Sequence, residues 1–319
     1  MKHLCRHPHP ILQTMILGCV CLVSACGNPK HNTSTASATA PAPVAPDVGA
    51  VANAAYDGVY DKPVQLKDGR YQGAPFVEDG ASRPTVTLID NVFVTGDLDG
   101  DGRQEAVALL AENSGGSGNR LYLAIVAIRS GIASNVATAL VGDRIQVRSI
   151  AIDGSAVVLD VIQAGAEDAM CCPSEMARRR FEFDGTALRE HGSESLGKFT
   201  LTNLEGSNWQ LAKFDFDDAA PQEPPITLTF TRGKIGGKSA CNRYFAAIAP
   251  GNAPGSVKIG PTGSTMMACP PEIMTLEDRY LKALPGVDRL GFVGGRLALG
   301  FSDEGARHTL LFDPTAPAD

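Results

Sequence analysis

The sequence is poor in aromatic residues and lacks the short motifs of common hydrolases. Phe, Trp and Tyr make up 6% of its 319 residues, and Trp209 is the only tryptophan. Neither an HExxH zinc motif nor a GxSxG nucleophile motif occurs, and after residue 26 the only histidines are His31, His191 and His308. We therefore expect a protein that is not an enzyme, although a catalytic site can also assemble from residues far apart in the sequence.

The apolar run near the N-terminus is too short to cross a membrane as a helix. Residues 11–25 read ILQTMILGCVCLVSA, and a helix of that length extends about 22 Å, against a hydrocarbon core of about 30 Å. Because Lys2 and Arg6 precede the run, we expect residues 1–25 to be a signal peptide. It ends in Val-Ser-Ala before Cys26, which resembles a lipobox, so we expect cleavage there and a lipid on the Cys26 thiol. An ordinary signal peptide followed by a chance cysteine is the alternative.

Lipidation would decide where the protein resides. Two or more acyl chains, such as palmitate, hold a protein stably on a bilayer, whereas one chain does not. In lipoproteins an Asp after the lipidated cysteine favours retention in the inner membrane, and Gly27 occupies that position here. We therefore expect an outer-membrane protein that faces the periplasm, with the membrane as one partner and an envelope protein as the other candidate.

The charge balance disfavours nucleic acid as a partner. The formal net charge is −7, and loss of Lys2 and Arg6 with the signal peptide would change it to −7 − 2 = −9. A negatively charged protein repels phosphate backbones, so we expect no nucleic-acid partner.

Cysteine usage agrees with an oxidising compartment. Of eight cysteines, three lie in the predicted signal peptide and Cys26 is the predicted lipid acceptor. The four that remain are an even number, as a disulfide framework requires. They are Cys171, Cys172, Cys241 and Cys269.

The composition along the chain divides it into a tether and two β-rich domains. Residues 26–55 are rich in Ala, Pro, Ser and Thr and contain no periodic apolar pattern, so we expect a flexible linker. Residues 56–195 hold short apolar runs separated by turn signals, among them Asp153-Gly154 and Asp184-Gly185. We expect an antiparallel β meander or barrel there, and mainly β structure overall.

Residues 196–319 show a second pattern of short strands with one helix among them. Pro270-Pro271 is typical of a helix start, and Pro285-Gly286 of a helix end. Between them Ile273, Leu276, Tyr280, Leu281 and Leu284 fall on one helical face. This pattern predicts an α+β domain in which one helix covers a sheet.

Residues 203–313 resemble the META domain of HslJ-type heat-shock lipoproteins. The matching pieces occur in order: Leu204-x-Gly206-x-x-Trp209-x-Leu211, residues 226–230, Gly237-x-x-x-Cys241-Asn242-x-Tyr244, Thr265-Met266-Met267-Ala268-Cys269, Glu277-x-x-Tyr280-Leu281 and Leu297-x-Leu299. The resemblance implies a small β-rich module of secreted or envelope proteins, with links to stress tolerance and no established catalytic residues. Residues 245–256 depart from the family's usual pattern, so this loop is expected to differ.

The four remaining cysteines allow three pairings. Cys241 and Cys269 follow separate predicted strands in the META-like region. A disulfide between them would close a loop and stabilise the folded state by about 3–4 kcal/mol, because it lowers the entropy of the unfolded chain. Two buried free thiols are the alternative. If Cys241 and Cys269 form a disulfide, Cys171 and Cys172 remain to form a vicinal disulfide with each other. We interpret that pair as a structural staple, with a redox or hydrolytic site as the alternative.

An acidic loop in the first domain carries the pattern of a calcium site. Asp97, Asp99, Asp101 and Glu105 occupy positions one, three, five and nine of a Gly-broken loop, and the main-chain carbonyl of Arg103 occupies position seven. Oxygen atoms in this order can converge on Ca²⁺, which takes six to eight such ligands. Position twelve is Ala108 rather than Glu, so the loop is not an EF-hand. A tight acidic turn without an ion is the alternative.

The Gly-Lys run at residues 233–239 is not a phosphate-binding loop. A Walker A motif needs four residues between its glycines, and here Arg232 stands where the first glycine is required. We therefore predict a β-turn for this run.

These patterns favour a membrane-anchored envelope lipoprotein that acts by binding or in stress tolerance, without catalysis. A calcium-binding ligand-recognition module is the second hypothesis, and a redox or hydrolytic enzyme that uses the Cys171–Cys172 region is the third.

Overall fold

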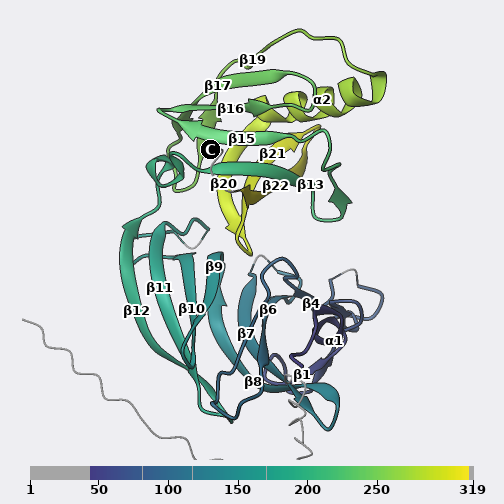
Figure 1. The fold of residues 1–319 in the computed structure, drawn as a ribbon, viewed down its shortest axis with the longest axis vertical. Coiled ribbons are helices and arrows are strands. Elements are labelled where there is room, and N and C mark those ends of the chain that lie inside the picture. Colours follow the sequence, from purple (N-terminus) through teal and green to yellow (C-terminus); the bar gives the residue numbers. More distant parts are fainter. Residues whose placement is uncertain (1–43, 81, 117, 170, 316–319) are drawn as a thin grey trace, which may run out of the picture. The chain divides into compact units, whose positions relative to one another are not determined.

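The computed structural model of the chain describes residues 44–315 except residues 81, 117 and 170 (Figure 1). The predicted signal peptide, Cys26 and most of the predicted linker lie outside the described residues. The described part is mostly β, with antiparallel sheets and one long helix near the C-terminus, which confirms the predicted fold class. No helix in this part is long and apolar enough to cross a membrane.

The first half of the described chain forms two larger antiparallel sheets. The six-stranded sheet has the order β3 (Arg70–Gln72), β4 (Thr85–Leu88), β6 (Glu105–Asn113), β7 (Arg120–Arg129) and β8 (Ile132–Asp143), and β5 (Val94–Gly96) also pairs with β6. The four-stranded sheet has the order β12 (Leu188–Lys198), β11 (Glu175–Phe183), β10 (Ala156–Gln163) and β9 (Gln146–Asp153). Their facing side chains share one apolar core, including Leu109, Leu123, Leu159 and Phe181.

Strands β6 and β7 are buried on both faces, which explains their unbroken apolar sequence. Alternate residues such as Leu109 and Leu123 face the core shared with the four-stranded sheet, and their neighbours Ala108 and Ala124 face a second core. A strand shows polar and apolar residues in alternation only when one of its faces meets water. The small alanines of the second face leave room for the segment that precedes the sheet.

The last residues of the predicted linker, which ends at residue 55, are folded and not flexible. Helix α1 (Val48–Ala52) begins after Asp47, whose carboxylate accepts the N–H of Ala50, and strands β1 (Ala55–Tyr56) and β2 (Val64–Gln65) pair with each other. Val51 and Ala54 are buried in the second core. Packed structure therefore begins before residue 55. The low apolar content of residues 26–55 hid it, because only a few side chains make the contact.

The second half of the described chain forms a ten-stranded antiparallel sheet. Its main path is β18 (Val257–Ile259), β17 (Arg243–Pro250), β16 (Lys234–Lys238), β15 (Thr227–Thr231), β13 (Asn208–Phe214), β22 (Ala306–Thr315), β21 (Arg296–Asp303) and β20 (Val287–Val293). The short strands β14 (Asp218–Ala219) and β19 (Gly263–Ser264) pair with β13 and β17. A 3₁₀ turn, η1 (Leu201–Leu204), precedes the sheet.

Helix α2 (Pro271–Ala283) lies where the prolines predict it and continues into the 3₁₀ turn η2 (Leu284–Gly286). Its buried side chains Tyr280 and Ala283 join the core of the ten-stranded sheet. Trp209 is buried in the same core, in agreement with a packing role.

The Gly-Lys run is mostly strand, so the predicted β-turn is wrong for most of its length. Only Arg232 and Gly233 form the turn, with positive φ values of 50° and 72°, and Thr231 already pairs with Lys234. Residues Lys234–Lys238 are strand β16. Glycines favour turns locally, but here pairing with two neighbouring strands outweighs that preference.

We predict that Ala108→Leu destabilises the fold by about 1–3 kcal/mol, because the added carbons would have to enter the packed contact between β6 and the α1 segment. Urea unfolding at equilibrium measures the change. Ala249→Leu, on the exposed side of β17, is the control and is expected to shift the free energy of unfolding by less than about 0.5 kcal/mol. Equal effects of the two substitutions would contradict the close packing inferred for Ala108.

Candidate functional site

The acidic loop between β5 and β6 brings three of its predicted ligands together. Carboxylate oxygens of Asp97, Asp99 and Glu105 all lie within 4.8 Å of one another. The loop keeps its shape through hydrogen bonds to the same side chains: the N–H groups of Gly100 and Gly102 donate to the two oxygens of Asp97, at 2.8 and 3.0 Å. Both glycines have positive φ, which L side chains rarely adopt.

Asp101, the fourth predicted carboxylate, is not part of this cluster and contacts Arg103, whose main-chain carbonyl was the fifth predicted ligand. Asp101 forms an ion pair with Arg103 at 2.6 Å and also accepts the N–H of Arg103 at 2.8 Å. Its carboxylate is therefore engaged away from the other three. These contacts lower the pKa of Asp101, chiefly through the side-chain hydrogen bond from Arg103.

Glu105 is the buried member of the cluster. Glu105 is the first residue of β6 and is 3% exposed. Its carboxylate accepts the N–H of Leu98 at 2.9 Å. Burial raises the pKa of Glu105, and the charges of Asp99, Asp101 and Asp97 raise it further. A divalent cation would relieve the repulsion between these carboxylates, as the calcium site predicts. The hydrogen bonds within the loop are also those expected of an acidic turn without an ion. The geometry is compatible with both predicted alternatives.

A second feature of the first half is a cleft of about 310 Å³ beside the Gly-rich loop that joins β6 to β7. Its lining includes Glu112, Ser114, Arg120 and Asp143. Glu112 is buried and accepts hydrogen bonds from Arg120 at 2.7 Å and from the Tyr60 hydroxyl at 2.8 Å. These contacts pair the buried charge within the protein, as a structural role requires.

The cysteines of the described residues lie in two bonded pairs. Cys171 is bonded to Cys172, and Cys241 is bonded to Cys269 across 28 positions of sequence. This is the pairing that the sequence left as one of three. Cys172 is buried, whereas Cys171 is exposed.

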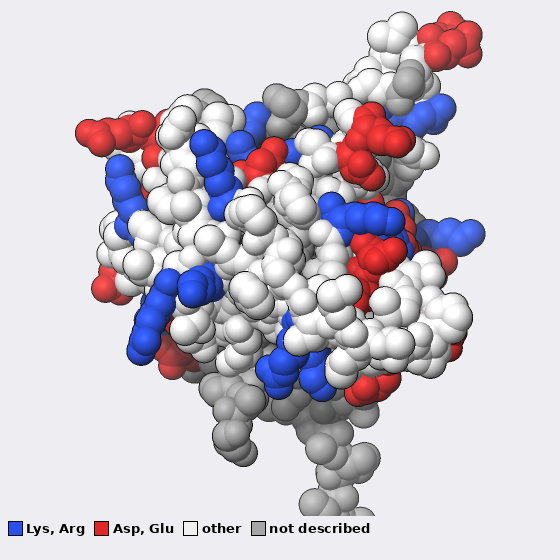
Figure 2. Space-filling view, turned by 90° about the horizontal axis from the view of Figure 1, so that it is seen from above, with Lys and Arg blue, Asp and Glu red and all other residues white. Residues whose placement is uncertain are grey.

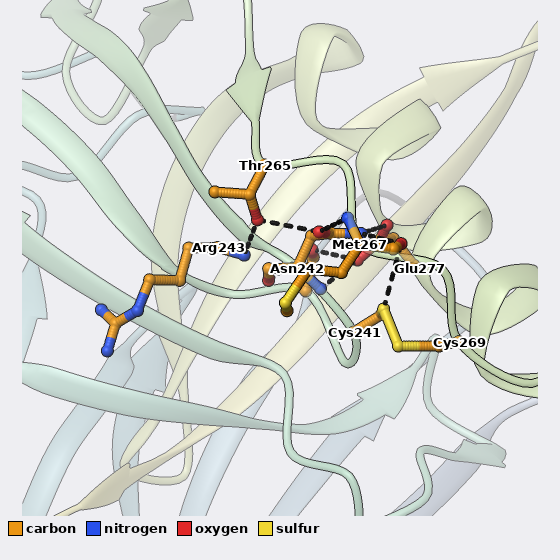
Figure 3. Close-up of a disulfide and its surroundings, with 8 residues drawn as sticks. Cys241, Asn242, Arg243, Thr265, Met267, Cys269 and Glu277 are labelled. Atoms are coloured by element: carbon orange, nitrogen blue, oxygen red, sulfur yellow. Dashed lines mark hydrogen bonds between the residues drawn. A yellow bond between two sulfur atoms is a disulfide. The ribbon is translucent and has the colours of Figure 1, made fainter.

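Beside the Cys241–Cys269 bond, a buried carboxylate joins helix α2 to the connection between β16 and β17 (Figure 3). Glu277 of α2 is 4% exposed and accepts the Ser239 hydroxyl at 2.6 Å. It also accepts the main-chain N–H of Asn242 at 2.7 Å and the side-chain amide of Asn242 at 2.8 Å. No cation among the described residues pairs with it. We call this set of contacts the Glu277 cluster.

Asn242 extends the Glu277 cluster to the segment before the helix. Its side-chain oxygen accepts the Thr265 hydroxyl at 2.8 Å and the N–H of Met267 at 2.7 Å. Because the side-chain amide already donates to Glu277, the residue fixes the strand end, the helix and the approach to Cys269 at once. Below the cluster, the hydroxyls of Tyr244 and Tyr280 meet at 2.6 Å, and burial raises the pKa of both.

The hydrogen bonds of the Glu277 cluster favour the ionised carboxylate. Burial alone would raise the pKa of Glu277, but donors from Ser239, Asn242 and the Cys241 main chain outweigh it, and the pKa is lowered. A carboxylate that receives several N–H and O–H donors is stable without a cation nearby. The sequence motif contained Glu277 and Asn242, but nothing in their spacing indicated that they would meet.

The comparisons agree with the resemblance seen in the sequence. Residues 202–316 match the META domain family, which confirms the predicted resemblance at residues 203–313. No curated protein matches the chain. The chain is similar to the NMR structure of a protein from Burkholderia xenovorans, with 27% identity and a TM-score of 0.30; the match covers 40% of this chain and 98% of that one. The META match points to a stress-related or envelope-associated role.

We predict that Glu277→Gln destabilises the fold by about 2–3 kcal/mol, because the amide would point a donor at groups that are themselves donors. Chemical unfolding measures the loss. Glu272→Gln is the matched control: Glu272 is exposed in the first turn of the same helix, and its loss is expected to cost less than about 1 kcal/mol.

The difference between wild type and Glu277→Gln also depends on pH. Because the folded pKa of Glu277 lies below its ordinary value of 4.5, its contribution is complete above that value and is lost as pH falls through the folded pKa. Unfolding at neutral and acidic pH tests the sign. A difference that grows on acidification would contradict an ionised Glu277.

Proposed function

We propose that the protein is a lipid-anchored lipoprotein of the cell envelope that binds an envelope partner or supports stress tolerance, without catalysis. Cys26 would carry the lipid, and Gly27 favours the outer membrane, with the folded part facing the periplasm. The META match supports an envelope-associated or stress-related role. The lack of catalytic motifs supports a binding role.

The pairing of the cysteines carries this proposal. All four cysteines of the described residues are within two disulfides. Disulfides persist in the periplasm and outside the cell, and they are rare in the reducing cytosol. The two disulfides therefore support export from the cytosol. The predicted signal peptide would direct that export.

The lipid anchor is tested by changing its acceptor. We expect the wild-type protein, expressed with its own N-terminus in a Gram-negative host, to fractionate with the outer membrane. Cys26→Ser should be lost from the membrane fraction, because the acyl chains of the anchor require the thiol of Cys26. Immunoblots of membrane and periplasmic fractions measure the distribution.

Cys21→Ser is the matched control, since this cysteine lies in the predicted signal peptide and is expected to be removed. It should leave membrane fractionation unchanged. Recovery of the wild type in the soluble periplasm, or the same distribution for wild type and Cys26→Ser, would contradict the proposal.

A calcium-dependent ligand-recognition module is the second candidate. It is favoured by one observation, the convergence of Asp97, Asp99 and Glu105 within 4.8 Å. Oxygen ligands of this kind suit Ca²⁺, and main-chain carbonyls or waters would complete its shell. The ion would join the ends of β5 and β6 and would stabilise the loop rather than take part in chemistry.

We predict that Ca²⁺ raises the melting temperature of the wild-type protein and leaves that of Glu105→Gln unchanged, because binding to the folded state alone stabilises it by mass action. Glutamine keeps an oxygen for the N–H of Leu98 but removes the buried charge. Asp61→Asn, an exposed carboxylate that changes the net charge equally, is the control and should respond like wild type. If Ca²⁺ shifts none of the three proteins, the loop is an acidic turn.

A further inference from the structure

One stretch of the META region has a charge opposite to that of the whole chain. Between Pro224 and Pro271 there is no Asp or Glu, although the chain has a formal charge of −7. The same stretch contains five basic residues, which are Arg232, Lys234, Lys238, Arg243 and Lys258. Figure 2 shows side chains of both signs on one face of the molecule, some of them in adjacent pairs and others surrounded by uncharged surface. The net charge therefore does not describe every surface.

The strand register places four of these cations on one side of the sheet. Lys238 lies opposite Arg243, and Lys234 lies opposite Ala247, so these residues project to the same side of β16 and β17. Lys258 of β18 lies opposite Ala249 and projects to that side as well. All four basic residues are exposed, while the alternate residues Ile235, Tyr244, Ala246 and Ile248 are buried in the core.

Exposed apolar side chains occur on and beside the same side. Phe245, opposite Gly236, is 63% exposed, and Met266 and Met267 are 97% and 55% exposed. The methionines lie along the edge of β17, because the N–H of Thr265 donates to the carbonyl of Arg243 at 3.0 Å. We call Lys234, Lys238, Arg243, Lys258, Phe245, Met266 and Met267 the basic face.

The four basic side chains of the basic face lack an acidic partner within the described part of the chain. None of the four forms an ion pair with another described residue. Lys238 and Arg243 are directly opposite like charges, an arrangement that weakens a strand pair. In Figure 3 Arg243 points away from the Glu277 cluster. Glu205 accepts the main-chain N–H groups of Arg232 and Gly233 at the turn before β16 and forms no ion pair with any of the four described basic side chains.

We propose that the basic face docks on the anionic surface of a lipid bilayer. The four cations would contact lipid phosphates, and Phe245 with the two methionines would enter the boundary between headgroups and acyl chains, the combination that peripheral proteins use. The inference rests on the proposed envelope location.

The test uses residues 27–319, which omit the predicted lipid acceptor and keep every described residue. Sedimentation with vesicles of phosphatidylethanolamine and phosphatidylglycerol measures binding, and phosphatidylcholine vesicles provide the neutral comparison. We expect binding to the anionic vesicles only, weakening as salt is added. One basic side chain at an anionic surface strengthens binding about fivefold, so Lys238→Gln with Arg243→Gln should weaken it about 25-fold.

Lys62→Gln with Lys67→Gln is the matched control, because both lysines are exposed and the net charge changes equally. The control should bind like wild type, and Phe245→Ser should weaken binding while the melting temperature stays unchanged. Equal loss in both double variants would overturn the proposal, as would no binding to anionic vesicles or tighter binding to single-stranded DNA than to lipid. The fractionation of Cys26→Ser uses membranes washed with concentrated salt, which removes binding through surface charges, so failure here is separable from failure of the anchor.

Discussion

The buried carboxylate of Glu277 is the constraint on which the META region depends. Glu277 is 4% exposed and has no cationic partner among the described residues, so its ionised carboxylate must receive hydrogen bonds from neutral donors. Removal of such a donor lowers the free energy of unfolding. The donors come from the β16–β17 connection, so α2 is fixed to that connection. Asn242 then transmits the constraint to Thr265 and Met267, and this positions both the Cys241–Cys269 bond and the exposed methionines.

The same cluster relates stability to the surface of the domain. The disulfide closes the segment that contains β17, β18 and β19. This segment carries two cations of the basic face, Arg243 and Lys258, together with its three apolar side chains. Covalent closure limits the unfolded chain, and the Glu277 cluster fixes the folded one. Functional side chains can therefore remain exposed and unpaired, because the structure beneath them does not rely on them.

Much of the fold was predictable because it follows from local patterns. The Asp153-Gly154 pattern predicted the hairpin of β9 and β10, although Asp153 pairs with Ala156 and the turn itself is Gly154-Ser155, with positive φ at Gly154. The prolines at 270 and 271 predicted the start of α2. Strand β8 was not predicted, because its Ser, Asn and Thr residues lack clear alternation. Strand β16 was mistaken for a turn, because its pairing depends on strands on both sides.

The candidate sites were predictable only in part, for a related reason. Spacing brought Asp97, Asp99 and Glu105 together, since they belong to one loop. It could not show that Asp101 pairs with Arg103, which depends on rotamers. Glu277 and Asn242 meet across 35 positions, and the basic face depends on strand register, which local sequence does not specify.

The proposed envelope role requires a chain that is exported, oxidised and lipidated. Mass spectrometry of the protein isolated from membranes, alkylated before reduction, tests this most directly. We expect an N-terminal peptide that begins at Cys26 and carries acyl chains, with Cys171, Cys172, Cys241 and Cys269 all protected from alkylation. An unmodified N-terminus elsewhere, together with four alkylated thiols, would contradict the account.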